Sequence, residues 1–136
     1  MDWTIEFDKA IEQYLPDLEV LQDEPMSRHT TFRIGGPAKR MAFPSSREQL
    51  VLLMSFAKNY GANPLVIGNG SNLLVPDEGL DRLVIDTSAN LNRVERGSGN
   101  TVLADAGATL ARTADLACKS GLTGLEFAHG IPGTLG

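Results

Sequence analysis

The run Gly68-Asn69-Gly70-Ser71-Asn72 joins two glycines, one residue apart, to a hydroxyl and an amide side chain. Glycine reaches positive φ angles without steric cost and lets a ligand come close to the backbone. A loop of this kind can turn several backbone N–H groups toward one point and so form an anion-binding nest. Ser71 and Asn72 can also hydrogen-bond a phosphate. The run therefore predicts an anion site, and a diphosphate is the expected guest.

Two common phosphate-binding motifs do not fit this run. The dinucleotide fingerprint G-x-G-x-x-G needs a glycine at its sixth position and a helix behind the phosphate. Leu73 occupies that position, and the apolar residues 73–75 predict a strand instead of a helix. No Gly-Lys-Ser/Thr sequence follows, so the run is not a P-loop. A tight hairpin turn without a ligand stays open as the alternative interpretation.

A second glycine-rich segment covers residues 130–136. Pro132 stiffens it, while Gly130 and Gly133 remove side chains that would block a flat ligand or a phosphate. Taken alone, the segment could equally be an ordinary loop between two elements. Two such segments in one small domain are stronger evidence for a ligand site than either segment alone.

Other reactive side chains predict little chemistry. His29 and His129 have no partner at a suitable spacing and are expected to be structural or surface residues. Cys118 is the only cysteine, so we expect no disulfide framework and no metal site, and we expect this thiol to pack as a small apolar group. Arg28 and Arg33 flank a polar cluster and could meet an anionic ligand. No nucleophile–base pair is evident.

Composition narrows the class of protein. The chain has 136 residues, 42% of them hydrophobic and 21% charged, as in a soluble globular domain. Its net charge of -5 argues against nucleic acid as the main partner. An acidic protein can still hold a diphosphate where backbone dipoles make the local potential positive. Because residues 1–6 show no signal peptide and no stretch could span a bilayer, we expect a cytoplasmic protein without a membrane partner.

The elements that must position the glycine loop follow from periodicity. An apolar stripe predicts a helix that Pro16 ends near Leu15, followed by an acidic extended arm over residues 19–26. The stripe consists of Phe7, Ala10, Ile11, Tyr14, Leu15 and Leu18.

Strands and one helix surround the loop itself. A capping box of Ser45 and Glu48 predicts the start of a helix that ends before Gly61. Short strands are predicted at residues 39–43, 65–67, 73–75 and 82–86.

A second block begins near Asn92. It has strands at residues 93–96 and 101–104 joined as a hairpin, and then a helix that ends before Gly121. One face of that helix is expected to carry Leu110, Ala114, Ala117 and Cys118. The whole pattern is α/β, but it is not a plain repeat of βαβ units.

Three segments in this order resemble the UDP-N-acetylenolpyruvoylglucosamine reductase family, flavoenzymes also called UDP-N-acetylmuramate dehydrogenases. They are residues 28–38, residues 67–75, and residues 121–127 running into residues 130–134. The resemblance covers roughly Pro25 to Gly136, and the combination is far more specific than any one motif.

The resemblance implies an α/β (α+β) fold, the FAD-binding domain of the vanillyl-alcohol-oxidase (PCMH) type, with FAD between two small α/β subdomains. Residues 1–24 would be an N-terminal helix and arm, residues 25–90 the first subdomain, and residues 91–136 the start of the second. The substrate-binding domain would be absent and the fold incomplete in this chain.

The resemblance also implies the residues that contact the cofactor. Residues 68–72 would hold the FAD diphosphate, while residues 106–108 and 130–134 would approach the pyrophosphate and flavin from the second subdomain. The expected FAD-binding residues are Gly68, Asn69, Gly70, Ser71, Asn72, Leu73, Ala106, Gly107, Ala108, Gly130, Ile131, Pro132, Gly133 and Thr134.

In the family's reaction NADPH reduces the flavin, and the hydride then passes to the enolpyruvyl double bond of the UDP-sugar. The product, UDP-N-acetylmuramate, is a peptidoglycan precursor. The catalytic serine, arginine and glutamate of the family are expected in segments after Gly136, so no catalytic residue is assigned here and this chain alone is expected to be inactive. A nucleotide-binding module without chemistry, or another FAD oxidoreductase of the same superfamily, are the alternatives.

Overall fold

The computed structural model describes residues 2–136, which contain both helices and strands. The order is α1 (Thr4–Tyr14), β1 (Val20–Pro25), η1 (Met26–Arg28), β2 (Pro37–Ala42), α2 (Arg47–Tyr60), β3 (Leu65–Ile67), β4 (Leu80–Asp86), β5 (Val94–Arg96), β6 (Val102–Ala104), α3 (Leu110–Lys119) and η2 (Glu126–Ala128). No helix in this range is long and apolar enough to cross a membrane.

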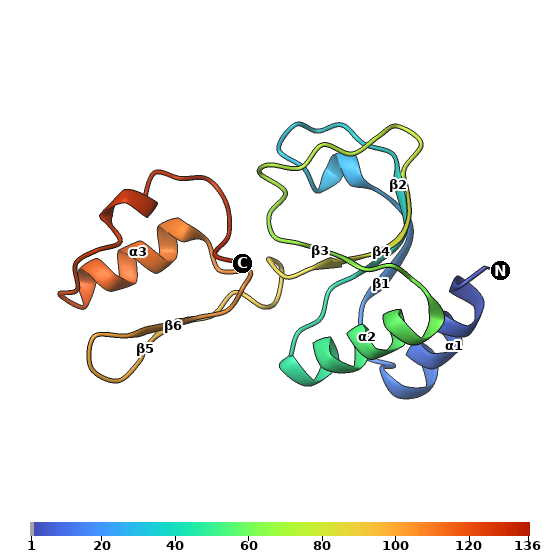
Figure 1. Ribbon diagram of the computed structural model, residues 1–136, viewed down its shortest axis with the longest axis horizontal. Coiled ribbons are helices and arrows are strands. Elements are labelled where there is room, and N and C mark those ends of the chain that lie inside the picture. Colours follow the sequence, from blue (N-terminus) through green and yellow to red (C-terminus); the bar gives the residue numbers. More distant parts are fainter. Residues whose placement is uncertain (1) are drawn as a thin grey trace.

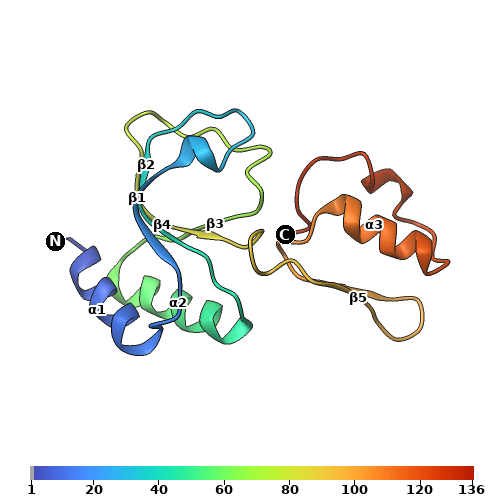
Figure 2. The same ribbon diagram turned by 180° about the vertical axis from the view of Figure 1, so that it is seen from behind.

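A four-stranded sheet in the order β1-β2-β4-β3 organises the first two thirds of the chain. β2, β4 and β3 run parallel, and β1 pairs antiparallel with β2 at one edge. Helices α1 and α2 cover one face, and the loops that follow β1 and β3 lie on the other side (Figure 1). The view from behind shows the same separation of helices and loops (Figure 2).

Apolar side chains fill both faces of this sheet. Phe7 of α1 and Leu53 of α2 pack with Ile85 of β4 in one buried cluster. Met41 and Val84 lie in a second cluster beneath the loops. Because both faces are covered, the carboxyl-terminal halves of β2 and β4 are buried, although both strands also carry charged residues.

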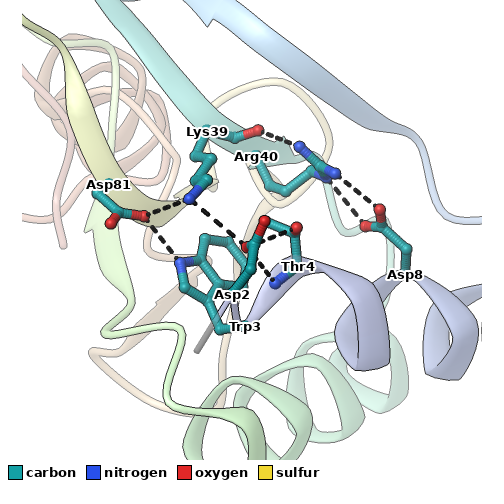
Figure 3. Close-up of polar contacts among 7 residues, drawn as sticks. All are labelled: Asp2, Trp3, Thr4, Asp8, Lys39, Arg40 and Asp81. Carbon is teal, nitrogen blue, oxygen red and sulfur yellow. Dashed lines mark hydrogen bonds and ion pairs between the residues drawn. The ribbon is translucent and has the colours of Figure 1, made fainter.

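The first helix and the acidic segment after it belong to this sheet unit. α1 ends at Tyr14, before Pro16, as predicted. The segment predicted as an extended arm is extended, and it pairs with β2 as β1. The Arg40 guanidinium of β2 donates two hydrogen bonds, of 2.9 and 2.7 Å, to the Asp8 carboxylate of α1 (Figure 3). The division into residues 1–24, 25–90 and 91–136 stays a prediction, and β1 crosses the first of these boundaries.

The predicted start of α2 was wrong by one residue. Ser46, not Ser45, is the N-cap, and its side chain accepts a hydrogen bond of 3.1 Å from the Gln49 N–H. Gln49 in turn accepts from the Ser45 N–H at 2.8 Å. Ser46 can cap because its backbone is still extended, with φ -146°, where the helix begins. The other end is confirmed, with Gly61 at φ +73° in the left-handed conformation.

The predicted strand at residues 73–75 is absent, and the segment is a loop. Val75 turns into the buried cluster beneath the loops, so close to Gly35 that a Cβ there would lie 2.8 Å from the Val75 Cβ. Gly36 donates its N–H to the carbonyl of Pro76 at 2.9 Å. Residues 70–79 therefore run beside residues 30–36 without a partner strand.

Residues 92–136 form a smaller unit beside the sheet (Figures 1 and 2). β5 and β6 form the predicted antiparallel hairpin, and α3 packs against it. The prediction that Cys118 is buried was wrong, because this residue is exposed. The buried stripe of α3 consists of Thr113, Ala114 and Ala117, and Cys118 lies one residue beyond it.

Candidate functional site

The glycine loop leaves the carboxyl end of β3, where β4 ends too. Ile67 and Asp86, the last residues of these parallel strands, are register partners. Open α/β sheets bind ligands at the carboxyl ends of their parallel strands. The loop at residues 68–73 therefore starts at the edge of the sheet where a ligand is expected.

Gly70 is needed by the fold of the chain itself. Its φ is +70°, and a Cβ on this residue would lie 1.9 Å from the His29 carbonyl oxygen. The Thr31 N–H also donates to the Gly70 carbonyl at 3.1 Å. Contacts with residues 29–31 thus hold the backbone of the loop in place without a ligand.

The backbone N–H groups of residues 68–73 are uncommitted. Within residues 2–136 none of them donates a hydrogen bond. A polar backbone group normally has a partner, and in a surface loop that partner is water or a ligand. A glycine-containing loop with a series of such donors has the chemistry of an anion-binding nest.

The second glycine-rich segment touches the loop. A Cβ on Gly68 would lie 1.9 Å from the Thr134 Oγ1, and the Ser71 hydroxyl donates to the Pro132 carbonyl at 3.5 Å. A hollow of about 290 Å³, here called the glycine-loop hollow, lies between the two segments. Its lining residues are Leu65, Val66, Ile67, Gly68, Asn69, Gly70, Ser71, Asn72, Leu73, Leu110, Pro132, Gly133 and Thr134.

The remaining predicted contact residues lie outside this lining. The carbonyls of Ala106 and Ala108 accept hydrogen bonds of 2.8 Å from Gly136 and Leu135. A Cβ on Gly107 would lie 1.9 Å from the carbonyl oxygen of Thr87. Residues 106–108 thus support the second segment and contact the connection between the two units.

Gly130 and Ile131 are exposed and do not line the glycine-loop hollow. Ile131 donates its N–H to the Ala128 carbonyl at 3.2 Å, which ties this end of the segment to η2. The half of the segment that faces the loop is residues 132–134.

A larger hollow of about 780 Å³, here called the polar hollow, continues from the loop toward residues 27–33. Asn69 lines both hollows. The polar hollow is lined by Ser27, Arg28, His29, Thr30, Thr31, Arg33, Asn69, Asp86 and Ser88.

Sequence reasoning singled out the arginines of the polar hollow but not Asp86. The available signal was the position of Asp86 at the end of a predicted strand, beside the strand that leads into the glycine loop. The His29 ring Nε2 lies 2.8 Å from a Glu24 carboxylate oxygen, so this histidine has a structural partner. Arg28 contacts the other Glu24 oxygen at 3.8 Å.

Comparison with known proteins identifies the family to which this chain belongs. Residues 38–136 match the family described as FAD binding domain. The chain is 44% identical over 141 aligned residues to UDP-N-acetylenolpyruvoylglucosamine reductase of Agathobacter rectalis, a match that covers 96% of this chain and 45% of that protein. The chain therefore spans less than half the length of the curated relatives it matches.

Solved structures show the same fold. UDP-N-acetylenolpyruvylglucosamine reductase of Thermus caldophilus is 31% identical with a TM-score of 0.59, over 88% of this chain and 40% of that one. An alkyldihydroxyacetonephosphate synthase, 22% identical with a TM-score of 0.64 over 86% of this chain and 26% of that one, shares the fold alone. The expected FAD-binding fold of the vanillyl-alcohol-oxidase type is thus confirmed. This chain belongs to the FAD binding domain family, and the relatives that it resembles along most of its length are UDP-N-acetylenolpyruvoylglucosamine reductases.

Proposed function

We propose that the chain holds FAD, with the diphosphate on the backbone N–H groups of residues 68–73. One observation carries the proposal. These donors have no partner within the described chain and lie at the ligand-binding edge of a parallel sheet. Membership of the FAD binding domain family supports FAD as the guest. Residues 132–134 would form the opposite wall.

The residues present fit such a dinucleotide. Ligand sites usually have volumes of about 300–1,000 Å³. The glycine-loop hollow and the polar hollow, about 290 and 780 Å³, meet at Asn69. N–H donors suit a diphosphate, and the polar side chains of the larger hollow suit the hydroxyl-bearing parts of a nucleotide. Residues 106–108, 130 and 131 lie outside the lining of the glycine-loop hollow and would support residues 132–134.

We further propose that the complete protein is a UDP-N-acetylenolpyruvoylglucosamine reductase that uses NADPH. The names of the relatives support the UDP-sugar as substrate. Bound FAD would supply hydride transfer from NADPH to the enolpyruvyl double bond. The residues of this chain would bind and orient the cofactor, and none is assigned to proton transfer. The exposed, free thiol of Cys118 suits a reducing compartment such as the cytoplasm.

Amide NMR spectra of the chain titrated with FAD and with ADP test the diphosphate site. We expect the amide resonances of residues 68–73 to shift more than any others, because phosphate oxygens become their hydrogen-bond acceptors. The hairpin turn at residues 97–100 is the internal control, since it is also glycine-rich but lies in the other unit.

Shifts confined to other segments, or equal shifts in both glycine-rich turns, would contradict the diphosphate site. We expect weak binding, because residues 132–134 and the loop already touch and must separate. A sub-micromolar dissociation constant for FAD would show that the two segments do not compete with the ligand in this way.

The activity is tested on the complete protein. Purified protein should carry FAD and oxidise NADPH only when enolpyruvyl-UDP-N-acetylglucosamine is added. Oxygen consumption without that sugar would favour another oxidoreductase of the superfamily. A protein that contains no flavin and stays inactive after FAD is added would refute the reductase assignment.

A further inference from the structure

Asp86 is a buried carboxylate at the ligand-binding edge of the sheet. It is the last residue of β4, beside Ile67 in the register, and only 5% of its surface is exposed. A buried carboxylate is costly unless its oxygens are hydrogen-bonded. The partners of each Asp86 oxygen therefore show what the residue does.

One oxygen of Asp86 accepts hydrogen bonds from the turn that follows it. Oδ1 accepts hydrogen bonds from the Ser88 N–H and hydroxyl, both 2.8 Å, and from the Ala89 N–H at 3.1 Å. These bonds close the turn that follows β4. They explain why an acidic residue stands here, but only for one of its two oxygens.

The other oxygen of Asp86 is left without a partner by the described part of the chain. Oδ2 has no hydrogen-bond partner among residues 2–136. In the same part of the chain, no side-chain N or O atom is both sealed from solvent and without a partner. Oδ2 is therefore accessible, and the space that Asp86 lines is the polar hollow.

We propose that Asp86 Oδ2 accepts a hydrogen bond from a hydroxyl of the nucleotide whose diphosphate lies on the glycine loop. This inference rests on the proposed FAD site and adds a residue that selects for hydroxyl groups. The ligand chemistry is a sugar or sugar-alcohol chain next to a phosphate, which is a ribose in the ADP half of FAD and a ribityl chain in the flavin half.

The charges around Asp86 favour a hydroxyl over a phosphate at this point. An ionised carboxylate only accepts hydrogen bonds, so it repels phosphate and attracts an O–H donor. Arg28 and Arg33 line the same hollow and can meet the phosphate charge, with Glu24 paired to Arg28. Asn69 lies between the two hollows and can approach both parts of the ligand.

The test compares ligands that differ only in hydroxyl groups. ADP is paired with 2′,3′-dideoxy-ADP, and FMN with an analogue whose ribityl chain is an unsubstituted pentyl chain. The variant is Asp86→Asn, because its amide oxygen can still close the turn to Ser88 while Oδ2 is lost. Dissociation constants come from amide shifts of residues 68–73 at millimolar ligand.

Asp2→Asn is the matched control. The Asp2 Oδ1 accepts from the Thr4 N–H at 3.1 Å and from the Thr4 hydroxyl at 2.7 Å, which is the same turn as at Asp86, but at the start of α1. The variant makes the same change of charge and removes the same kind of carboxylate. It lies outside both hollows.

In the wild-type chain we expect that, in one of the two ligand pairs, the ligand without hydroxyls binds about tenfold more weakly than its partner. This is the effect of losing a hydrogen bond to a charged group. The affected pair identifies the ribose or the ribityl chain as the source. In Asp86→Asn the preference should fall to about threefold or less, since a neutral amide replaces the charge. Asp2→Asn should keep the full preference.

Two kinds of result would overturn the inference, and only the second would also refute the diphosphate site. Equal affinities within both ligand pairs, or a preference that Asp86→Asn leaves unchanged, refute the role of Asp86 while the diphosphate site stands. If no ligand shifts the amides of residues 68–73, the diphosphate site itself is refuted and the role of Asp86 with it.

Discussion

At the scale of single residues, the glycine loop is built by contacts inside the chain as much as for a ligand. Gly70 meets the carbonyl of His29, and Gly68 meets Thr134. The sequence predicted that this loop needs residues that can adopt a positive φ and that let another group come close to the backbone. It could not show that the approaching group at Gly70 is a carbonyl 41 positions earlier in the chain, because such a contact depends on the tertiary fold.

Replacing Gly70 by alanine should therefore lower the stability of the chain before it affects binding. Gly99→Ala is the matched control, since Gly99 has a similar φ of +61° and no atom within 4 Å of an added Cβ. We expect about 1 kcal/mol for Gly99→Ala, from the left-handed backbone alone. We expect about 3 kcal/mol for Gly70→Ala, because the His29 carbonyl must also move.

Urea unfolding followed by circular dichroism gives both free energies of unfolding. Equal losses of stability in the two variants would mean that the loop can accommodate a side chain at residue 70 by a small shift of its backbone.

At the scale of elements, the sequence predicted most of the helices and strands. α1, α2, α3 and the strands β2, β3, β4, β5 and β6 lie close to their expected ranges, because periodicity and terminal glycines are local signals. The predicted strand at residues 73–75 is absent because Leu73 and Val75 pack into the buried cluster beneath the loops instead of pairing with a strand, while Leu74 is exposed. The cap of α2 failed because two serines in succession both satisfy the pattern, and only the backbone conformation selects one.

The same cap gives a direct test of the structure. Ser46→Ala should destabilise the chain by about 1 kcal/mol, because the Gln49 N–H loses its acceptor. Ser45→Ala is the control. Its hydroxyl donates an exposed hydrogen bond of 3.0 Å to the Gln49 side chain, so we expect a loss of about 0.5 kcal/mol or less.

Thermal and urea unfolding of the two variants measure the difference. A larger loss of stability for Ser45→Ala would indicate that Ser45 caps α2, as the sequence predicted.

The candidate site was only partly predictable at this scale. The family resemblance predicted that the two glycine-rich segments approach the same ligand, and the structure brings residues 68–73 and 132–134 together. The polar hollow could not be foreseen, because its lining comes from η1, the loop after it, the glycine loop and the end of β4. Asp86 joins it only because β4 lies beside β3 in the sheet.

At the scale of the whole molecule, polar contacts join the N-terminal helix to the sheet. The Trp3 indole N–H donates to the Asp81 carboxylate at 3.0 Å, and the Lys39 ammonium lies 3.2 Å from the same carboxylate oxygen (Figure 3). Lys39 also reaches Asp2 at 3.5 Å. Residues near both ends of the sheet unit are thus held by one group of charges.

This group should make stability depend on acid. The pKa of Asp81 is lowered, first by the hydrogen bond from Trp3 and then by that from Lys39. The pKa of Asp2 is lowered by its hydrogen bonds from Thr4. A carboxyl whose folded pKa lies below its unfolded value contributes stability above the unfolded value, about 3.9 for Asp, and loses it as pH falls through the folded pKa.

We expect the thermal midpoint to fall as pH is lowered below about 4, and to fall less in Asp81→Asn, which cannot titrate at that position. Asp17→Asn is the control, since Asp17 is an exposed aspartate away from this group. Midpoints at neutral and acidic pH measure the effect. The same acid dependence in all three proteins would show that the charges around Lys39 do not contribute.

The contact between the Ser71 hydroxyl and the Pro132 carbonyl has a kinetic consequence. It lies across the gap between the two glycine-rich segments, next to the place where Gly68 meets Thr134. A dinucleotide that must pass between these segments can enter only while the contact is broken. Its association should then be slower than for a site that is always open, and the observed rate should level off at high ligand concentration, where opening of the gap becomes rate-limiting.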